Sequence, residues 1–339
     1  MRIGFNPHKD KLETSSDYFH QIIVPVYIPN FEGYFKDSFK ILQLCLESIF
    51  KTSHSQTFIT IVNNGSCVEI KNYLDQLLIQ KRIHELIHTQ NIGKLNAILK
   101  GLYGSNFKLV TITDADVLFL NNWQKETYTV FENFPKAGVI CPTPSSKSLR
   151  TYTSTIYWDL FFSNKLKFQP VKNPEALLKF AESIDYENFY NQFQLQKIFT
   201  VNAPNCKAVV GAGHFVSTYK TEIFNDINIR FSNYKLGGDS EGKFLDEPVV
   251  KLGLWRLSTY DNFAYHLGNV QEDWMDKQLN LLASEQNSYN FESNYFKKHS
   301  KISNFIVNKI FSKFILNKKI FKQFIVWKGL PKDAVNKYL

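Results

Sequence analysis

The chain has 339 residues, of which 44% are hydrophobic and 21% charged; this allows a sizeable core and excludes disorder along the whole chain. The formal net charge is +9, but nine lysines and no acidic residue lie between Lys297 and Lys328, so the rest of the chain is about neutral. The four cysteines form no CxxC pair, which argues against a zinc ribbon, a redox dithiol or a disulfide framework.

The N-terminal residues lack the apolar segment of a signal peptide. No run of about 18 apolar residues predicts a transmembrane helix. We therefore expect a cytoplasmic protein in a reducing compartment.

Strands and helices alternate along the first part of the chain. QIIVPVYIP at 21–29 is apolar and β-branched, which predicts a buried strand. Apolar residues at three- and four-residue steps between Phe39 and Ile49 predict a helix. TFITIVNNGS at 57–66 predicts a second strand that ends in an Asn-Asn-Gly-Ser turn. The pattern then predicts strands at 83–89, 109–120 and 137–144, helices at 68–83 and 91–104, and a short helix before residue 137. Such alternation predicts an α/β fold with a Rossmann-like, mostly parallel sheet flanked by helices, and with ligands at the carboxyl ends of the strands.

The later part of the chain breaks this rhythm. Residues 145–200 are rich in aromatic side chains, and we interpret them as an insertion or a helical excursion over the sheet edge. Residues 207–224 predict a strand, a glycine turn and a further strand or helix. Residues 245–255 predict the start and body of a helix, and residues 257–269 complete the main body.

Two carboxylates stand in the middle of LVTITDADVLFL, the strand predicted at 109–120. In a strand, Asp114 and Asp116 would point to the same side, and two like charges so close would raise each other's pKa. Mg²⁺ or Mn²⁺ accepts oxygen ligands and would remove this conflict, bringing a diphosphate with it. An acidic turn at a strand end is at least as good an interpretation of the bare motif.

Four segments of the first half occur in a characteristic order: VPVYIPN, IVNNGS, NIGKLNAILKG and TDADVLF. This order resembles the nucleotide half of family 2 glycosyltransferases, which have the GT-A fold. There the pattern is VPxYN, a D-D-G-S-like turn, N-x-G-x-x-x-A and DxD. GAGHFVSTYKTEIF, LDEPVVKLG and FAYHLGN resemble the acceptor strand, the acidic motif and the terminal histidine motif of the same family. The resemblance covers residues 20–270.

The resemblance implies a metal and diphosphate site. Asp114 and Asp116, with Ala115 between them, would hold Mn²⁺ or Mg²⁺ and the diphosphate of a nucleotide sugar. His266 would be a third metal ligand or a phosphate contact, although a lone histidine is more often a satisfied structural residue. Lys94 could reach the pyrophosphate, or could be an exposed lysine in the first turn of a helix.

The resemblance also implies a nucleoside pocket and a reaction. Pro25, Val26 and Tyr27 would line the pocket for base and ribose. Asn63 and Asn64 stand where the family has an acidic residue that reads the base, which leaves the nucleotide open. The implied reaction is inverting glycosyl transfer from a nucleotide sugar, with a UDP-sugar as first choice, to a hydroxyl of a saccharide or lipid-linked saccharide. Its expected setting is bacterial-type surface polysaccharide or lipid-linked glycan synthesis.

A carboxylate must accept the proton of the acceptor hydroxyl in such a reaction. Asp246 is the first candidate, Glu247 the second and Asp239 the third. These acidic residues also suit the first turn of a helix, and capping is compatible with catalysis. The aromatic residues of 145–200 would contact the acceptor as a region.

The expected organisation is a domain at 1–290 followed by a helical extension at 291–339. The domain would contain a nucleotide-sugar half at 1–145 and an acceptor half at 145–270. The extension mixes lysine with Ile, Phe and Trp, which suits an interfacial helix on an anionic membrane through residues 297–328, at the inner face. A helical pair packed on the body, with solvated lysines, is the alternative, and no motif predicts nucleic acid binding.

Other functions fit the same sheet. A nucleotidyltransferase would carry a glycine-rich loop with Lys or Arg near the N-terminus, and VPVYIPNFEG lacks it. A non-catalytic glycan- or membrane-binding protein on a transferase scaffold is the other alternative. The presence of Asp114, Asp116, Asp246 and His266 argues against it.

Overall fold

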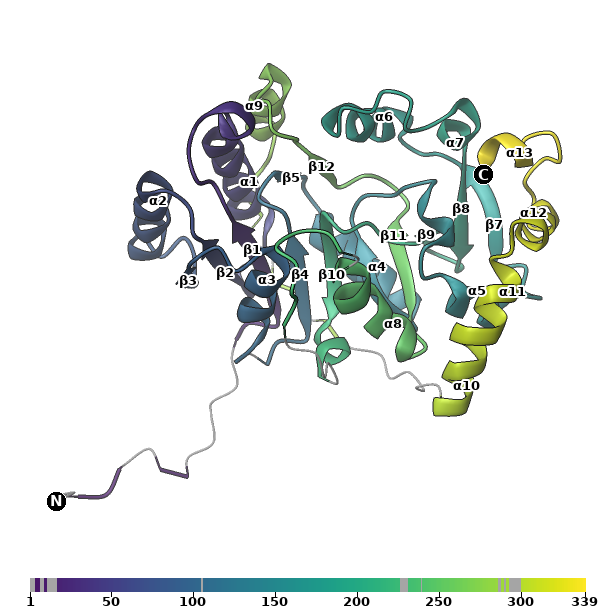
Figure 1. Ribbon diagram of the computed structural model, residues 1–339, viewed down its shortest axis with the longest axis horizontal. Helices are drawn as coiled ribbons and strands as arrows, with labels where there is room; N and C mark the ends of the chain where they lie inside the picture. Colours follow the sequence, from purple (N-terminus) through teal and green to yellow (C-terminus); the bar gives the residue numbers. More distant parts are fainter. Residues whose placement is uncertain are drawn as a thin grey trace.

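A central sheet of ten strands organises the protein in a computed structural model (Figure 1). The structure describes residues 4–6, 9–10, 17–104, 106–225, 231–238, 240–285, 288–289, 291–292 and 300–339. The strands are β1 (His20–Val26), β2 (Thr57–Asn64), β3 (Glu85–Thr89), β4 (Leu109–Thr113), β5 (Val117–Phe119), β6 (Ala137–Cys141), β7 (Leu166–Pro170), β8 (Lys197–Asn202), β9 (Lys207–Val210), β10 (Val216–Lys220), β11 (Trp255–Thr259) and β12 (Ala264–His266).

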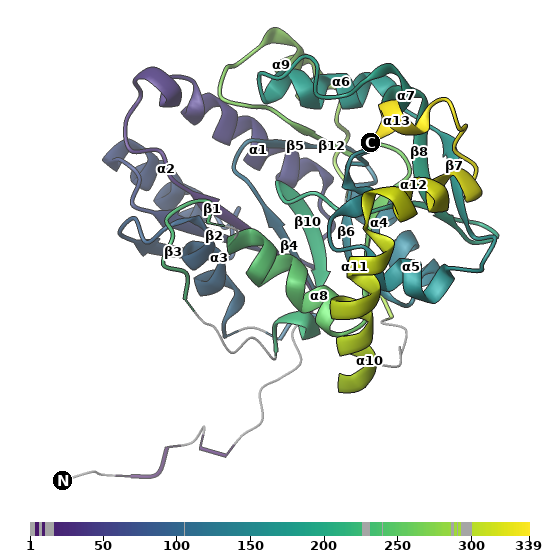
Figure 2. The ribbon, with the colours of Figure 1, turned by 45° about the vertical axis from the view of Figure 1, so that its right-hand side comes forward.

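Helices cover both faces of this sheet (Figures 1 and 2). They are α1 (Ser38–Thr52), α2 (Val68–Ile79), α3 (Lys94–Leu102), α4 (Trp123–Asn133), α5 (Ser154–Leu160), α6 (Pro174–Ser183), α7 (Gln192–Gln196), α8 (Glu247–Lys251), α9 (Asp273–Asn280), α10 (Lys301–Phe305), α11 (Ser312–Ile315), α12 (Lys318–Trp327) and α13 (Val335–Tyr338). Short 3₁₀ turns lie at Gly33–Phe35, Ser148–Arg150 and Thr221–Phe224, and π-helical turns lie at Gly242–Asp246 and Ile306–Phe311. Among the described residues, no helix is both long and apolar enough to cross a membrane.

The sheet has the order β3-β2-β1-β4-β10-β6-β11-β9-β8-β7. The first four strands are parallel, and the pairings place β7, β9 and β10 opposite to the other seven. In β1, Ile22, Ile23 and Val24 are completely buried, as expected for a strand covered on both faces. The predicted α/β architecture, with a mostly parallel sheet flanked by helices, is therefore confirmed.

The single strand predicted at 109–120 is wrong. β4 ends at Thr113 and β5 begins at Val117, and β5 pairs with β12 in a separate two-stranded sheet. Asp114, Ala115 and Asp116 form the link between the two sheets and not part of a strand. The apolar residues on both sides are buried, and burial in two different sheets leaves the same apolar pattern in the sequence.

Residues 145–200 add both helices and strands. The helical excursion expected here exists as α5, α6 and α7, but the segment also supplies β7 and β8, which extend the far edge of the sheet. Its aromatic residues form much of a second hydrophobic cluster, with Tyr157 and Phe199 among the buried members. A first cluster joins β1, β2 and β4 to α1, α2 and α3.

The C-terminal helices pack on the second cluster. Phe321, Phe324, Ile325 and Tyr338 are buried there together with Tyr157. The Tyr338 hydroxyl donates a hydrogen bond to the Lys197 carbonyl, with 2.9 Å between the oxygens. The C-terminal segment therefore shares a core with the body, as the packed-helix alternative predicted.

Tyr338→Ala tests the contribution of this packing to stability. Because the ring is buried and the hydroxyl is bonded, we expect the free energy of unfolding to fall by about 3–5 kcal/mol. Urea denaturation measures the change, with Tyr186→Ala as the control, since Tyr186 is 55% exposed. Equal, small effects of both changes would contradict a shared core.

Candidate active site

A cavity of about 520 Å³ lies at the carboxyl ends of β1 and β4. It contains most of the side chains predicted to bind the donor and the metal. The predicted residues that line it are Pro25, Val26, Tyr27, Asn64, Lys94, Asp114, Ala115, Asp116 and His266. We call it the first cavity.

Aromatic residues that the sequence analysis missed form one wall of the first cavity. Tyr27 and Phe35 pack edge to face with 6.0 Å between ring centroids, and Phe35 and Tyr34 do so at 5.2 Å. Asn269 donates a hydrogen bond from its side chain to the Tyr34 carbonyl at 3.3 Å. The segment FEGYF directly after the VPVYIPN motif was a signal for this wall.

The predicted donor contact Asn63 does not reach the first cavity. Asn63 is buried, accepts a hydrogen bond from the Ser66 backbone N–H at 3.0 Å, and lies 3.0 Å from His88 Nδ1. Neighbouring residues of a strand point to opposite faces, so only Asn64 lines the cavity. Its side-chain oxygen accepts from the Ile92 N–H at 2.9 Å and holds the loop before α3.

The turn of Asp114, Ala115 and Asp116 is clamped by its backbone. The Asp114 N–H donates to the Phe215 carbonyl at 2.7 Å, and the Leu267 N–H donates to the Asp116 carbonyl at 2.7 Å. These bonds tie the turn to the start of β10 and the end of β12. Both carboxylates line the first cavity, so tertiary contacts produce the common orientation that the sequence analysis had derived from a strand.

The Asp116 carboxylate is incompletely satisfied. Its Oδ1 atom is buried and has no hydrogen-bond partner, and its Oδ2 atom lies 3.5 Å from His266 Nε2. Burial, together with the nearby charge of Asp114, raises the pKa of Asp116 to about 6. A buried carboxylate oxygen without a partner beside a second carboxylate fits a hard divalent cation.

The described part of the chain contains no closed metal cluster. In the described residues, no three His, Cys, Asp or Glu side chains are gathered closely enough to hold a metal ion. His266 uses Nδ1 for a contact of 2.8 Å with Ser183 Oγ, so Nε2 faces Asp116. Asp114, Asp116 and His266 line the same cavity, so these three side chains could hold a cation there.

A second cavity of about 420 Å³ shares Lys94, Asp114 and His266 with the first. Aromatic and polar residues of the later part of the chain complete it. They include Ser145, Lys147, Phe180, Phe189, Tyr190, His214, Phe215 and Glu241. The predicted aromatic region thus contributes side chains to a cavity that opens beside Asp114.

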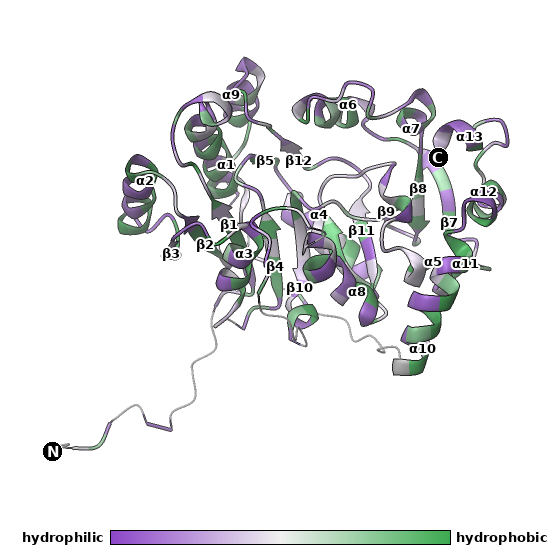
Figure 3. Cartoon of the chain, in the orientation of Figure 1, coloured by the Kyte–Doolittle hydropathy of each residue, from purple (hydrophilic) through white to green (hydrophobic). Residues whose placement is uncertain are grey.

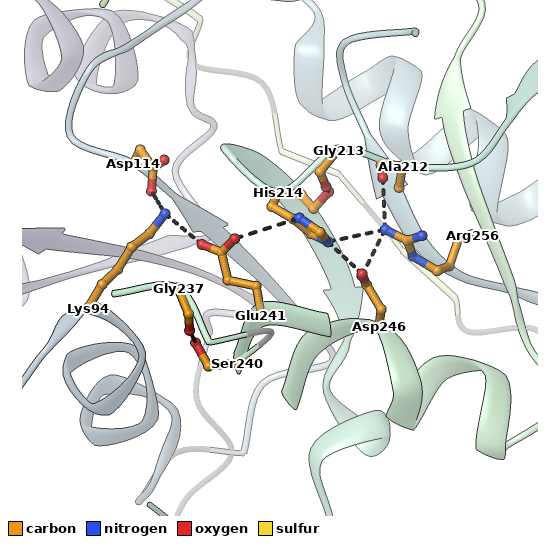
Figure 4. A network of polar contacts seen from close by, with 11 residues as sticks. Lys94, Asp114, Ala212, Gly213, His214, Gly237, Ser240, Glu241, Asp246 and Arg256 are labelled. Atoms are coloured by element: carbon orange, nitrogen blue, oxygen red, sulfur yellow. Dashed lines mark hydrogen bonds and ion pairs between the residues drawn. The ribbon is translucent and has the colours of Figure 1, made fainter. Parts of the chain in front are cut away.

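A chain of charged groups connects the two cavities to the protein interior (Figure 4). Lys94 Nζ lies 2.6 Å from Asp114 Oδ1 and 2.9 Å from Glu241 Oε1. His214 Nδ1 lies 3.7 Å from Glu241 Oε2, and His214 Nε2 lies 2.5 Å from Asp246 Oδ2. Lys94 is therefore an ion-paired residue of both cavities and not an exposed helix lysine.

These pairs favour the charged forms of Lys94 and Glu241. Burial lowers the pKa of Lys94, but Asp114 and Glu241 outweigh it, and the net pKa is raised. Burial raises the pKa of Glu241, but Lys94 and His214 outweigh it, and the net pKa is lowered. Glu241 is therefore ionised at neutral pH and faces the second cavity.

Asp246, the first candidate for the base, lies behind His214. Its side chain is completely buried, and its Oδ1 atom lies 2.7 Å from Nη2 of the equally buried Arg256. Arg256 also donates hydrogen bonds to the Thr151 and Ala212 carbonyls, both at 2.7 Å. A buried carboxylate held by an arginine and a histidine does not meet an acceptor hydroxyl, so the structure does not support Asp246 in that role.

The other base candidates also fall elsewhere. Glu247 lies in the first turn of α8 and pairs with Lys251 at 3.0 Å on the surface, and no side chain caps the start of this helix. Asp239 lies outside the described residues. Glu241, in the same acidic segment, is the carboxylate that reaches the second cavity, and the sequence carries no signal that separates it from its acidic neighbours.

Asp116→Asn tests how far the buried negative charge of Asp116 destabilises the folded protein. The pKa of Asp116 is about 6 in the folded protein, above the ordinary value of 3.8. Between these pH values the folded protein therefore binds more protons than the unfolded chain. As a result, the free energy of unfolding falls as the pH rises from about 4 to 6. We expect the variant to be more stable than the parent at pH 7.5 by about 1–2 kcal/mol, and equally stable near pH 4. Urea denaturation at both pH values measures this, and a variant less stable at pH 7.5 would contradict it.

Comparisons with known proteins agree with the family that the sequence resembles. The family described as Glycosyl transferase family 2 matches residues 22–199, which is more than half of the chain. No curated protein matches the sequence significantly.

Solved structures show similarity at low identity. TarS from S. aureus is 12% identical with a TM-score of 0.42, over 78% of this chain and 38% of TarS. GalNAc-T7 with UDP, GalNAc and Mn²⁺ is 10% identical with a TM-score of 0.46, over 75% of this chain and 44% of that chain. The mannosyltransferase PcManGT from Pyrobaculum calidifontis, in complex with GDP-Man and Mn²⁺, is 12% identical with a TM-score of 0.43, over 97% of this chain and 82% of that chain. The chain thus spans less than half the length of TarS and of GalNAc-T7.

The family match extends from β1 to β8. The chain belongs to glycosyltransferase family 2 and has the GT-A type of fold.

Proposed function

We propose that the protein transfers a sugar from a nucleotide-sugar donor in the first cavity to a saccharide hydroxyl in the second. Family membership makes the chain a glycosyltransferase; the assignment of each cavity is the proposal. The observation that carries it is the shared boundary of Lys94, Asp114 and His266. A sugar attached to a diphosphate at this boundary would face both cavities at once, as transfer between two substrates requires.

The first cavity has the chemistry for a nucleoside diphosphate. Tyr27 and the neighbouring aromatic wall can stack on a base, and Asn64 offers a neutral amide beside them. Asp114, Asp116 and His266 would hold Mn²⁺ or Mg²⁺, which supplies charge neutralisation for the departing diphosphate when bound. Lys94, at the N-terminus of α3, adds a positive charge where a diphosphate would lie. A UDP-sugar is the first donor to test.

The second cavity has the chemistry for an acceptor. Phe180, Phe189 and Tyr190 offer faces for sugar rings, and Ser145 and Lys147 offer hydrogen-bond donors. Glu241 would accept the proton of the acceptor hydroxyl on Oε2, because Lys94 occupies Oε1. The acceptor oxygen then bonds to the anomeric carbon while the bond to the diphosphate oxygen breaks. Attack opposite the leaving group inverts the anomeric carbon without a covalent enzyme intermediate.

Asp246 and Arg256 would act through His214. The buried pair of Asp246 and Arg256 fixes the imidazole, whose Nδ1 atom lies beside Glu241. Asp246 is then a positioning residue and not the base. The family match disfavours the nucleotidyltransferase alternative, and no feature of either cavity favours a non-catalytic binding protein.

Thermal stabilisation by nucleoside diphosphates tests the donor site. We expect UDP with Mn²⁺ to raise the melting temperature of the parent, UDP alone to do so less, and Asp116→Ala to lose the metal-dependent part. GDP, ADP and CDP with and without Mn²⁺ complete the panel, and Glu247→Ala is the control outside both cavities. If no diphosphate stabilises the parent, or if Asp116→Ala responds like the parent, the proposed donor site is wrong.

Glu241→Gln tests the proposed base. The amide keeps the shape and a contact with Lys94 but cannot take a proton, so we expect nucleotide stabilisation to persist while the transfer rate falls by about 10²–10⁴-fold. Release of the nucleoside diphosphate from the stabilising donor is measured with a panel of nitrophenyl glycosides as acceptors. Glu247→Gln should keep the parent rate. Retention of most activity by Glu241→Gln would assign the base elsewhere, whereas loss of nucleotide binding would show a donor-site role instead.

A further inference from the structure

The helix that runs through α10 and α11 exposes apolar residues where a surface helix is normally polar. Ile302, Phe305, Ile310 and Phe314 are 75%, 60%, 58% and 51% exposed. They recur at three- to five-residue steps and share the outward side with Ile306. The opposite side is apolar as well, because Val307 and Ile315 are completely buried against the body. Figure 3 shows hydrophobic and hydrophilic bands along this helix.

Aromatic residues near the same helix extend this surface. Trp158, at 43% exposed, packs on Phe311 of the helix with 5.1 Å between ring centroids. Phe162 is 87% exposed and lies 6.3 Å from the ring of Trp327, itself 54% exposed. We call the set the apolar face; it comprises Trp158, Phe162, Ile302, Phe305, Ile306, Ile310, Phe314 and Trp327.

The charged residues of this helix and of the segment just after it are all basic. Lys309 and Lys313 are exposed between the apolar residues of the helix, and Lys318 and Lys319 are exposed just beyond it. The sequence has no Asp or Glu from residue 300 to residue 332. Lys328 does not belong to this surface, because it is buried and donates to the carbonyls of Phe161 and Ser163.

We propose that the apolar face binds the surface of an anionic lipid bilayer. Large apolar side chains interleaved with lysines, without acidic residues, can enter the headgroup region while the ammonium groups meet lipid phosphates. A second copy of the chain is a poorer occupant, because a symmetric pair would bring the lysines of both copies together. The membrane contact predicted at 297–328 included Lys328, which is buried, and did not include Trp158 and Phe162 of the body, which are exposed.

The apolar face belongs to a helical layer that also supports the second cavity. Tyr338 ends this layer, and its hydroxyl lies 3.4 Å from the Ser146 carbonyl, between the cavity residues Ser145 and Lys147. Asn191, next to the cavity residue Tyr190, donates to the Lys337 carbonyl at 2.6 Å. A membrane-bound face would therefore present this half of the protein to the bilayer. Delivery of a lipid-linked acceptor from the membrane rests on the proposed function; membrane binding itself does not.

Sedimentation of the full-length protein with vesicles tests the proposal. The probes are phosphatidylcholine vesicles and vesicles with about 30% phosphatidylglycerol. We expect binding to the anionic vesicles at least about fivefold stronger than to neutral ones, and weaker at high salt. Ile310→Glu with Phe314→Glu should reduce binding at least about tenfold. Two apolar side chains that would enter the bilayer are then replaced by negative charges, which anionic lipid repels.

The controls distinguish a loss of membrane binding from a loss of folding or of nucleotide binding. Ile79→Glu changes an exposed apolar residue of α2 (70% exposed) and should leave vesicle binding unchanged. Lys309→Glu with Lys313→Glu should remove the preference for anionic lipid. Stabilisation by nucleoside diphosphate should be the same in the parent and the face variants. Vesicle binding does not depend on the donor site, so failure of the donor-site proposal would leave the vesicle test valid.

Three results would overturn the proposal: no binding to either vesicle, equal binding to both vesicles, or unchanged binding after the Ile310 and Phe314 changes. Light scattering after size exclusion gives the mass in solution. A dimer in the parent that the Ile310 and Phe314 changes convert to a monomer would assign the face to self-association instead.

Discussion

The ammonium group of Lys94 lies between two carboxylates from distant parts of the chain, and the site depends on this arrangement. Asp114 follows β4, whereas Glu241 comes from the segment just before α8. Without the lysine, two negative charges would face each other across partly buried space, at a cost that grows as water is excluded. With it, the segments that carry Asp114 and Glu241 can approach each other, and the first and second cavities can share a wall.

The charged groups behind this wall hold one another in place. Arg256 is buried and fixed by the carbonyls of Thr151 and Ala212, and it holds Asp246, which in turn holds His214. A buried pair of this kind is not a reason for high stability, because desolvation offsets much of the attraction. Its value here is geometric, since it sets the imidazole beside Glu241 at the cavity surface.

The C-terminal helices combine two roles that usually conflict. Their inner residues join the core around Tyr157 and Phe199, while the outer residues of α10 and α11 remain apolar and exposed. Several large apolar side chains exposed along one helix often mark a binding surface. The proposed bilayer contact accounts for both the apolar residues and the lysines among them.

The sequence by itself determined the alternation of strands and helices, the parallel first half and most of the candidate donor and metal residues that line the first cavity. These follow from local patterns: apolar runs define buried strands, and parallel strands place the residues after them at one edge. It did not determine that Asp114 and Asp116 lie in a turn between two sheets, because burial in either sheet gives the same apolar run. Nor could it show that Asn64, and not Asn63, lines the first cavity, because this depends on the side of β2 to which each side chain points.

Only the tertiary structure decided which acidic residue of the late segment reaches a cavity. Asp246, Glu247 and Glu241 have the same charge and similar neighbours in sequence, and each is suited to a helix start. Their surroundings differ because Arg256 and His214 enclose Asp246, while Lys94 from α3 holds Glu241 at the second cavity. Such partners are far away along the chain, so no local pattern records them.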